Sequence, residues 1–180
     1  PPHRINHRAN IWALKSLGVE GVVAINSVGS LKPEIKPGSF LVPNDFLSFW
    51  LVSTFFDDEM KFMVPRMDAD HAARLHARCE ALRMPARLGG IYIQTQGPRL
   101  ETVAEISMLK QFGDVVGMTM ASEATLSMEQ ELPYASLCSI DNYCHGIAEP
   151  ALTIDQIQEH VKENIRRVET LIRSLIPGDF

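Results

Sequence analysis

Five polar residues stand in predicted loops that follow short apolar segments, where their side chains could bind a small ligand: Asn26, Ser27, Glu101, Thr119 and Asn142. Hydroxyl groups and accessible backbone N–H groups can hold an oxyanion such as phosphate or a carboxylate. An amide both donates and accepts hydrogen bonds and a carboxylate accepts them, so the two together can recognise the edge of a heterocycle. The same residue types are common in turns, helix caps and first helical turns. Composition and spacing alone leave both interpretations open.

These residues belong to four loops, which we place at residues 26–29, 96–102, 117–119 and 141–144. Ligands of α/β proteins collect in the loops beyond the strand ends. A glycine or small residue after a single strand is usually no more than a turn residue. Four such loops in one small domain favour a shared pocket.

Alternating strand-like and helix-like segments must position these loops. Apolar, often β-branched runs predict strands over residues 21–25, 39–42, 90–94, 114–118 and 134–140. Helical spacing of apolar residues predicts helices over residues 5–17, 68–83, 101–111, 122–131 and 153–176, the last with a stripe that includes Ile165, Val168 and Ile172. Residues 26–30 and 36–38 are predicted as turns, and residues 44–67 as irregular. This order predicts an α/β fold in three layers, with helices on both sides of a mostly parallel or mixed sheet.

The composition is that of one globular domain, with 180 residues, 46% apolar and 22% charged. A net charge of −5 argues against nucleic-acid binding, which requires a basic face. No apolar run reaches the roughly 18 residues of a membrane span. Three cysteines cannot all pair, which indicates reduced thiols in a cytoplasmic protein. Because the chain begins at Pro1 without an initiator Met, we expect residues 1–180 to form an N-terminally incomplete domain.

The sequence offers little support for metal or nucleophile chemistry. His71 and His76 are five residues apart and would point to different faces of a helix. Cys138, Cys144 and His145 lack a standard zinc-ligand spacing. Cys144 has no identifiable base and better suits an apolar pocket wall. Dinucleotide-binding, Walker and nucleophile-elbow motifs are missing, so we expect neither a metal nor an organic cofactor.

Four segments, in order along the chain, closely resemble the purine nucleoside phosphorylase and methylthioadenosine phosphorylase family. They are residues 6–15, residues 24–31 with 35–38, residues 96–105, and residues 115–119 with 122–124. The third, beginning Gln96-Gly97-Pro98-Arg99, is similar to the family's most distinctive signature. The resemblance implies the nucleoside phosphorylase fold and a homotrimer whose pocket lies at a subunit boundary. It also implies phosphorolysis, in which inorganic phosphate, the co-substrate, attacks the anomeric carbon of a purine nucleoside as the purine leaves.

The resemblance also implies roles for the residues at the phosphate and ribose end of such a site. Asn26, Ser27 and Thr119 would hold phosphate. Met118 would contact the ribose, and Ile154 would approach its 5′ side and influence which substituent is accepted.

At the base end, the resemblance implies that Asn142 faces N7 and the 6-position of the purine and stabilises the departing base. Tyr143 and Cys144 would complete that wall, Glu101 would bind the other edge of the purine, and Leu100 would pack on the ring.

Asn142 is the residue from which we expect a preference between 6-oxopurine and adenine nucleosides. By this resemblance, adenine-type members of the family carry an Asp at the position of Asn142, whereas 6-oxopurine members carry an Asn. Glu101 also matches the 6-oxopurine members. We therefore expect inosine, guanosine or 5′-methylthioinosine as the nucleoside. A register shift of one residue would put Asp141 in this place instead.

Two alternatives remain open from the sequence. One is a methylthioadenosine phosphorylase with an altered base wall. The other is a catalytically inactive homologue that acts as a binding or assembly protein, because the family's Gly-rich phosphate loop and Arg-His pair would precede Pro1.

Overall fold

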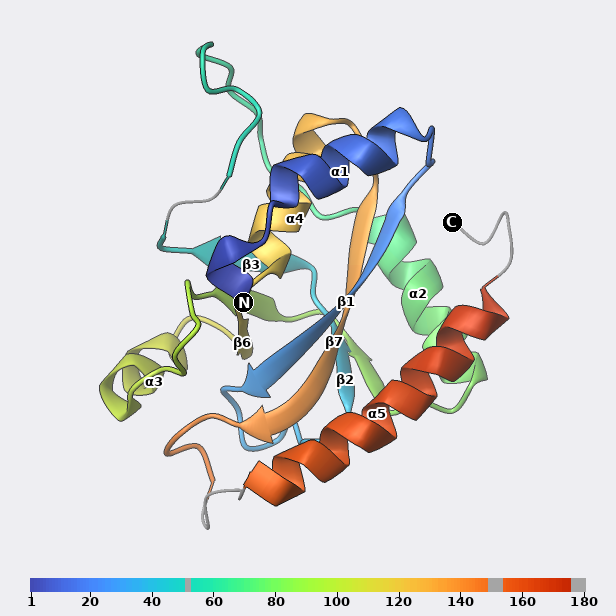
Figure 1. Cartoon of the computed structure of the whole chain (residues 1–180). Coiled ribbons are helices and arrows are strands. Elements are labelled where there is room, and N and C mark those ends of the chain that lie inside the picture. Colours follow the sequence, from blue (N-terminus) through green and yellow to red (C-terminus); the bar gives the residue numbers. More distant parts are fainter. Residues whose placement is uncertain (51–52, 149–153, 176–180) are drawn as a thin grey trace.

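The computed structural model describes residues 1–50, 53–148 and 154–175 (Figure 1). In chain order its elements are the 3-10 helix η1 (Pro2–Arg4), α1 (His7–Ser16), β1 (Val22–Ser30), β2 (Phe40–Val42), β3 (Asp45–Ser48), α2 (Ala69–Ala81), β4 (Ala86–Leu88), β5 (Ile91–Gln94), α3 (Val103–Leu109), β6 (Val115–Gly117), α4 (Met120–Glu129), β7 (Tyr134–Tyr143) and α5 (Ile154–Ser174).

Within the described residues, seven strands form one mixed sheet in the order β3-β5-β6-β1-β7-β2-β4. The pairs β3/β5, β5/β6, β1/β7 and β2/β4 are parallel, whereas β1/β6 and β2/β7 are antiparallel. The long strands β1 and β7 run side by side through the middle of the molecule (Figure 1). The predicted α/β fold with a mixed sheet is confirmed.

Alternate residues of β7 pack against helices on opposite faces of the sheet. Ala135 and Leu137 belong to a core cluster that includes residues of α2 and α5. Tyr134, Cys138 and Ile140 belong to another, which includes residues of α4. Since successive side chains of a strand point to opposite faces, the helices cover both sides of the sheet and form the predicted three layers.

The buried face of α5 differs from the predicted apolar stripe. Ile165 and Ile172 are about half exposed, whereas Leu171 is fully buried and Asn164 is 1% exposed. Asn164, Val168 and Leu171 follow one another at steps of four and three, so a polar residue occupies the face that packs on the sheet. The helix was correctly predicted, but its buried face is rotated toward Asn164.

Two strand ends were wrongly predicted as turn or loop. β1 continues through Ser30 across the turn expected over residues 26–30, and β7 continues through Tyr143 into the loop expected at 141–144. The two strands pair along their whole length, from Val22 opposite Tyr134 to Ser30 opposite Tyr143. Polar residues extend these strands because residues distant in sequence form hydrogen bonds with their side chains.

Other differences concern short elements. The stretch predicted as irregular over residues 44–67 contains β3, and the unpredicted β4 follows α2. The helix predicted from residue 101 begins at Val103, where Thr102 and Glu105 form a capping box. The helix predicted from residue 122 begins two residues earlier, at Met120.

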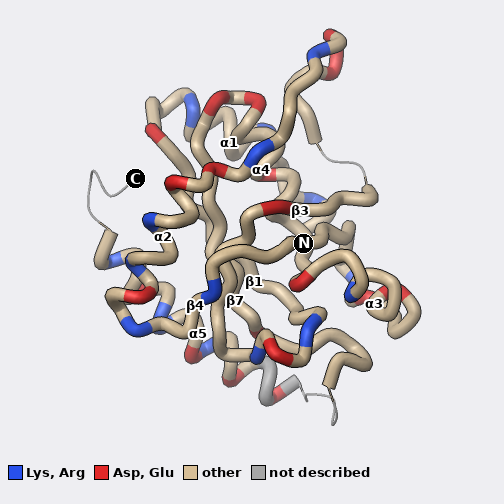
Figure 2. The backbone as a smooth tube through the Cα atoms, turned by 180° about the vertical axis from the view of Figure 1, so that it is seen from behind, with Lys and Arg blue, Asp and Glu red and all other residues tan. Residues whose placement is uncertain are grey.

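Acidic and basic residues are interspersed along the described chain (Figure 2). Among the described helices, none is both long enough and apolar enough to cross a membrane.

Candidate active site

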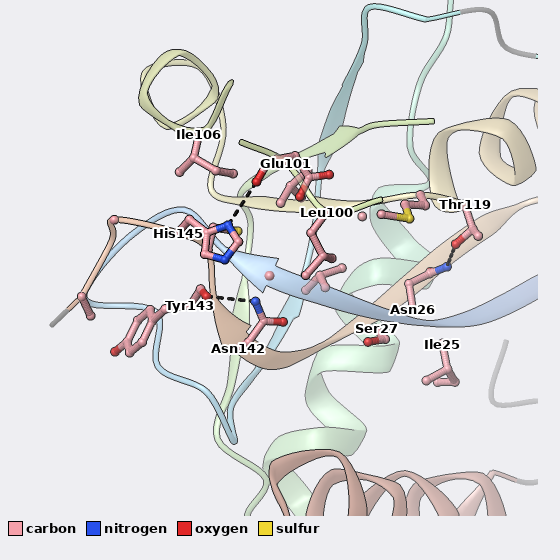
Figure 3. A pocket seen from close by; sticks show the side chains of 18 residues that line it. Ile25, Asn26, Ser27, Leu100, Glu101, Ile106, Thr119, Asn142, Tyr143 and His145 are labelled. Carbon is pink, nitrogen blue, oxygen red and sulfur yellow. Dashed lines mark hydrogen bonds between the residues drawn. The ribbon is translucent and has the colours of Figure 1, made fainter. Parts of the chain in front are cut away.

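A cavity of about 410 Å³ opens beside the ends of β1 and β7, next to β6 and the beginning of α4 (Figure 3). Nine of the ten residues expected at a site line it: Asn26, Ser27, Leu100, Glu101, Met118, Thr119, Asn142, Tyr143 and Cys144. The tenth, Ile154, begins α5, and its side chain lies outside the described residues. The predicted shared pocket therefore exists, although two of its walls are strands rather than loops.

Asn26 connects the centre of the sheet to the beginning of α4. Its Nδ2 donates to Thr119 Oγ1 at 2.8 Å, and its Oδ1 accepts a hydrogen bond from Ser136 Oγ at 2.6 Å. Because the Thr119 oxygen accepts from Asn26, the Thr119 hydroxyl proton stays available to a ligand. Asn26 is 5% exposed, so its side chain orients Thr119.

Side chains from β5 accept hydrogen bonds from backbone N–H groups at the beginning of α4. Tyr92 Oη accepts from the backbone N–H of Thr119 at 3.1 Å and of Met120 at 3.3 Å. Gln94 Oε1 accepts from the N–H of Ser122 at 3.2 Å. Tyr92 is fully buried, and this burial raises the pKa of its phenol and keeps it neutral. At this helix end the Thr119 hydroxyl is a donor available to an oxyanion.

Asp141 points away from the cavity. Ser27 Oγ donates to its Oδ2 at 2.5 Å, while Ser139 Oγ at 2.6 Å and Asn164 Nδ2 at 3.2 Å donate to its Oδ1. Asp141 is 3% exposed and is not among the residues that line the cavity. Since the Ser27 hydroxyl donates its hydrogen bond to Asp141, the Ser27 oxygen is left as an acceptor toward the cavity.

A β-bulge determines which of these neighbouring residues reaches the cavity. Val28 stands opposite Ile140, but Gly29 stands opposite Asn142, so Asp141 is the extra residue of β7. The resulting register brings Asn142 to the cavity and leaves Asp141 beside α5. Of these two residues, the structure brings Asn142 to the cavity.

Asn142 and Glu101 both present polar groups to the cavity, and they lie apart with Leu100 between them in the view (Figure 3). Asn142 Nδ2 donates one hydrogen bond to Tyr143 O at 2.9 Å, which leaves the second N–H and Oδ1 for a ligand. Glu101 is 8% exposed, and its Oε1 accepts from Thr95 Oγ1 at 2.6 Å. Its second oxygen is a further acceptor for a ligand.

Comparison with known proteins identifies the family. Residues 1–177 match the Phosphorylase superfamily. The chain belongs to this superfamily. A probable S-methyl-5′-thioinosine phosphorylase of Methanocaldococcus jannaschii is 44% identical, over 100% of this chain and 73% of the relative. A probable 6-oxopurine nucleoside phosphorylase of Archaeoglobus fulgidus is 41% identical, over 98% of this chain and 73% of the relative.

Solved structures agree with this assignment. A mutant adenosine/methylthioadenosine phosphorylase of Schistosoma mansoni in complex with tubercidin superposes with a TM-score of 0.84 at 26% identity. The match covers 96% of this chain and 70% of the other. The family resemblance and the nucleoside phosphorylase fold expected from the sequence are confirmed.

In this phosphorylase superfamily member, the cavity wall at Asn142 and Cys144 depends on close packing at Gly29. A Cβ at this position would lie 2.6 Å from Cys144 Sγ and 3.2 Å from Asn142 Nδ2. Burial raises the pKa of the Cys144 thiol to about 12. The thiol is therefore neutral and contributes an apolar surface, as its lack of a base in the sequence indicated.

The sequence did not predict several residues that line or support this phosphorylase cavity. His145 lines it, and its Nδ1 lies 3.1 Å from Glu101 O. Its position directly after Cys144 was an available signal, because the predicted loop stopped one residue short. Tyr92 and Gln94 support α4 from a strand, and nothing local in the sequence indicated that role.

In the part of the chain that the structure describes, no group of three or more His, Cys, Asp or Glu side chains could hold a metal ion. His71 and His76 lie on α2, outside the cavity.

Proposed function

We propose that this protein cleaves purine nucleosides with inorganic phosphate, preferring 6-oxopurines such as inosine, guanosine or 5′-methylthioinosine. Phosphate oxygen would form a bond to C1′ of the ribose as the bond from C1′ to N9 breaks. The bonding electrons would go to the purine, and N7 would take up, through solvent, the proton that hydrogen phosphate loses as it becomes the ester. The observation that carries this proposal is the pair of Asn142 and Glu101 in one cavity.

The hydrogen-bonding groups of this pair complement a 6-oxopurine. Its 6-oxygen accepts from the free N–H of Asn142, and its N1–H donates to the Glu101 carboxylate. The Asn142 oxygen can accept from a protonated N7 and so stabilise the leaving base. A 6-aminopurine presents a donor to the amide N–H and an unprotonated N1 to the carboxylate, so both contacts would be mismatched. The names of the two relatives described above support this preference.

We assign the phosphate to the end of the cavity at Thr119. The Thr119 hydroxyl would donate to a phosphate oxygen, with Asn26 fixing its orientation. The positive end of the α4 dipole also favours an anion there. No Lys or Arg is among the described residues that line the cavity. These residues would therefore contribute the Thr119 hydroxyl and the field of α4, while the Ser27 oxygen, which is an acceptor, would bind a protonated oxygen of the phosphate.

The remaining assignments follow the shape of the cavity. Met118, next to Thr119, would contact the ribose, and Leu100 would cover the purine ring between the polar ends of the cavity. Tyr143 and Cys144 would complete the base wall. Ile154 would lie near the 5′ substituent.

We also propose that the protein works as a cytoplasmic homotrimer without an organic cofactor. Phe49 is 56% exposed and Trp50 is 38% exposed, which suits burial against another subunit. The three cysteines are free and buried, as in a reducing compartment. Light scattering during size-exclusion chromatography would test the trimer, and a monomeric mass would contradict it.

The decisive experiment follows release of free base from inosine, 5′-methylthioinosine, adenosine and 5′-methylthioadenosine, with and without phosphate. We expect phosphate-dependent release of hypoxanthine together with ribose 1-phosphate or its 5-methylthio derivative. Faster release of adenine would favour a methylthioadenosine phosphorylase. Nucleoside binding without turnover of any of the four would favour the inactive homologue.

A further inference from the structure

The Asp141 carboxylate is buried, and its hydrogen-bonding partners among the described residues are neutral. Its donors are the hydroxyls of Ser27 and Ser139 and the amide of Asn164, at 2.5, 2.6 and 3.2 Å. A buried carboxylate is costly unless its oxygens are well hydrogen-bonded. Three neutral donors from β1, β7 and α5 therefore fix the position of this carboxylate closely.

The same residue is the extra residue of the bulge in β7. It lies between Ile140, opposite Val28, and Asn142, opposite Gly29. A one-residue change of register moves each following side chain to the other face of a sheet. Loss of this bulge would therefore turn Asn142 away from the cavity and bring a different residue opposite Gly29.

We infer that Asp141 is a positioning residue for purine selectivity: its hydrogen bonds to Ser27 and Asn164 hold the bulge that presents Asn142 to the 6-position of the base. Asn164 then influences base selectivity from α5, although it is not among the residues that line the cavity. This inference rests on the proposed function, because it concerns the same base-binding wall.

Asn164 is well placed for this role. Its Nδ2 lies within hydrogen-bonding distance of Ser139 Oγ at 2.8 Å and Ile140 O at 3.3 Å, in addition to Asp141. These three acceptors are consecutive residues of β7 that lead to the bulge. Asn164 shares the buried face of α5 with the apolar residues Val168 and Leu171, and the amide N–H groups of Asn164 are directed to the strand.

The test compares Asp141→Ala, Asp141→Asn and Asn164→Ala with the unmodified protein. The measured quantities are kcat/KM for inosine and for adenosine, the KM of phosphate, and the melting temperature. We expect Asp141→Ala to lower the inosine-to-adenosine ratio by about tenfold, since mismatched polar contacts discriminate strongly. We expect Asn164→Ala to lower it by about fivefold, the size of one lost hydrogen bond, and the KM of phosphate to change less than the ratio.

Asp141→Asn separates positioning from stability alone. An amide can still accept from Ser139 and can donate to the Ser27 oxygen, so this variant should retain more of the ratio than Asp141→Ala. Glu129→Gln is a matched control, because the Glu129 carboxylate accepts from Thr54 Oγ1 and Phe55 N away from the cavity. It should leave the ratio unchanged.

An unchanged inosine-to-adenosine ratio in Asn164→Ala and Asp141→Asn would overturn the inference. An equal loss of kcat/KM for inosine and adenosine, with a parallel rise in the KM of phosphate, would also overturn it. If Asp141→Ala does not fold, Asn164→Ala and Asp141→Asn still test the inference. If the unmodified protein cleaves no purine nucleoside, the proposed function fails. Calorimetric binding of hypoxanthine and adenine to the same proteins then tests the inference, and an equal preference in all of them overturns it.

Discussion

Replacement of Asn142 by Asp tests the assignment of the base wall most directly. In the structure, Asn142 Nδ2 donates to Tyr143 O, and the buried carboxylate of Glu101 lies in the same cavity. An ionised carboxylate at position 142 would face the Tyr143 carbonyl with an acceptor and would be repelled by Glu101. Both effects favour the protonated form of the introduced side chain.

The size of the effect follows from the contacts that change. A protonated carboxyl group has a single donor where the amide has two N–H groups. It cannot donate both to Tyr143 O and to the 6-oxygen of the purine, so a 6-oxopurine complex loses one of these contacts. Loss of a hydrogen bond that becomes an unsatisfied contact costs about 1.5–3 kcal/mol. Since about 1.4 kcal/mol corresponds to a factor of ten, kcat/KM for inosine should fall roughly 10- to 100-fold.

Adenine nucleosides should gain from the same substitution. A protonated carboxyl group can donate to N7 while its other oxygen accepts from the 6-amino group. Glu101 still faces the unprotonated N1 of adenine, so the gain should be smaller than the loss for inosine. Because the donor requires a proton, the adenosine activity of Asn142→Asp should decrease as the pH rises.

The assay is steady-state phosphorolysis of inosine, adenosine and their 5′-methylthio analogues at saturating phosphate. Asn142→Ala is the matched control, because it removes the amide without supplying a carboxyl group and should lower kcat/KM for inosine without raising it for adenosine. The reasoning is refuted if the unmodified protein already prefers adenosine, or if Asn142→Asp leaves the inosine-to-adenosine ratio unchanged.

Three further substitutions test the phosphate end and its support. Thr119→Ala should raise the KM of phosphate, or lower kcat, by the equivalent of about 1.5–3 kcal/mol, and unaltered phosphate kinetics would contradict its assignment. Tyr92→Phe removes the acceptor of the Thr119 and Met120 N–H groups, so chemical denaturation should show a loss of about 1–3 kcal/mol in the free energy of unfolding, and no measurable loss would contradict that role. Burial raises the pKa of the Glu123 carboxyl, so the folded state holds this proton more tightly than the unfolded state. The free energy of unfolding should decrease as the pH rises above the ordinary Glu value of about 4.5 through the raised one; Glu123→Gln, which keeps an acceptor for Tyr134 Oη, should remove that decrease, and an identical pH dependence in both proteins would contradict the argument.

Local pattern was sufficient to predict most of the elements but not where β1 and β7 end. The run of β-branched residues at 21–25 indicates a strand, whereas Asn26 and Ser27 have side chains typical of turns. They continue the strand because Ser136 and Asp141, more than a hundred residues further along the chain, take up their hydrogen bonds. Such partners cannot be identified from a local window of sequence.

The buried face of α5 shows the same limit in a helix. Ile165 and Ile172 form a regular apolar stripe with Val168, and helical periodicity alone favours burying them. The folded helix buries Asn164 instead, because the buried acceptors of β7 lie opposite it. A polar residue beside an apolar stripe is normally expected to face solvent, and only the position of the partner strand reverses that expectation.

Asp141 and Asn142 show both limits of prediction from local sequence, the unknown strand end and the unknown partner, in two adjacent residues. Either could supply the polar group that faces a purine, and a difference of one residue in register decides between them. That register depends on the bulge opposite Val28 and Gly29, and the bulge is bound to β1 by Ser27 and to α5 by Asn164. Base selectivity in this protein should therefore depend on an amide from the last helix as well as on the residue that contacts the base, which is why the selectivity of Asn164→Ala is as informative about the site as that of Asn142→Asp.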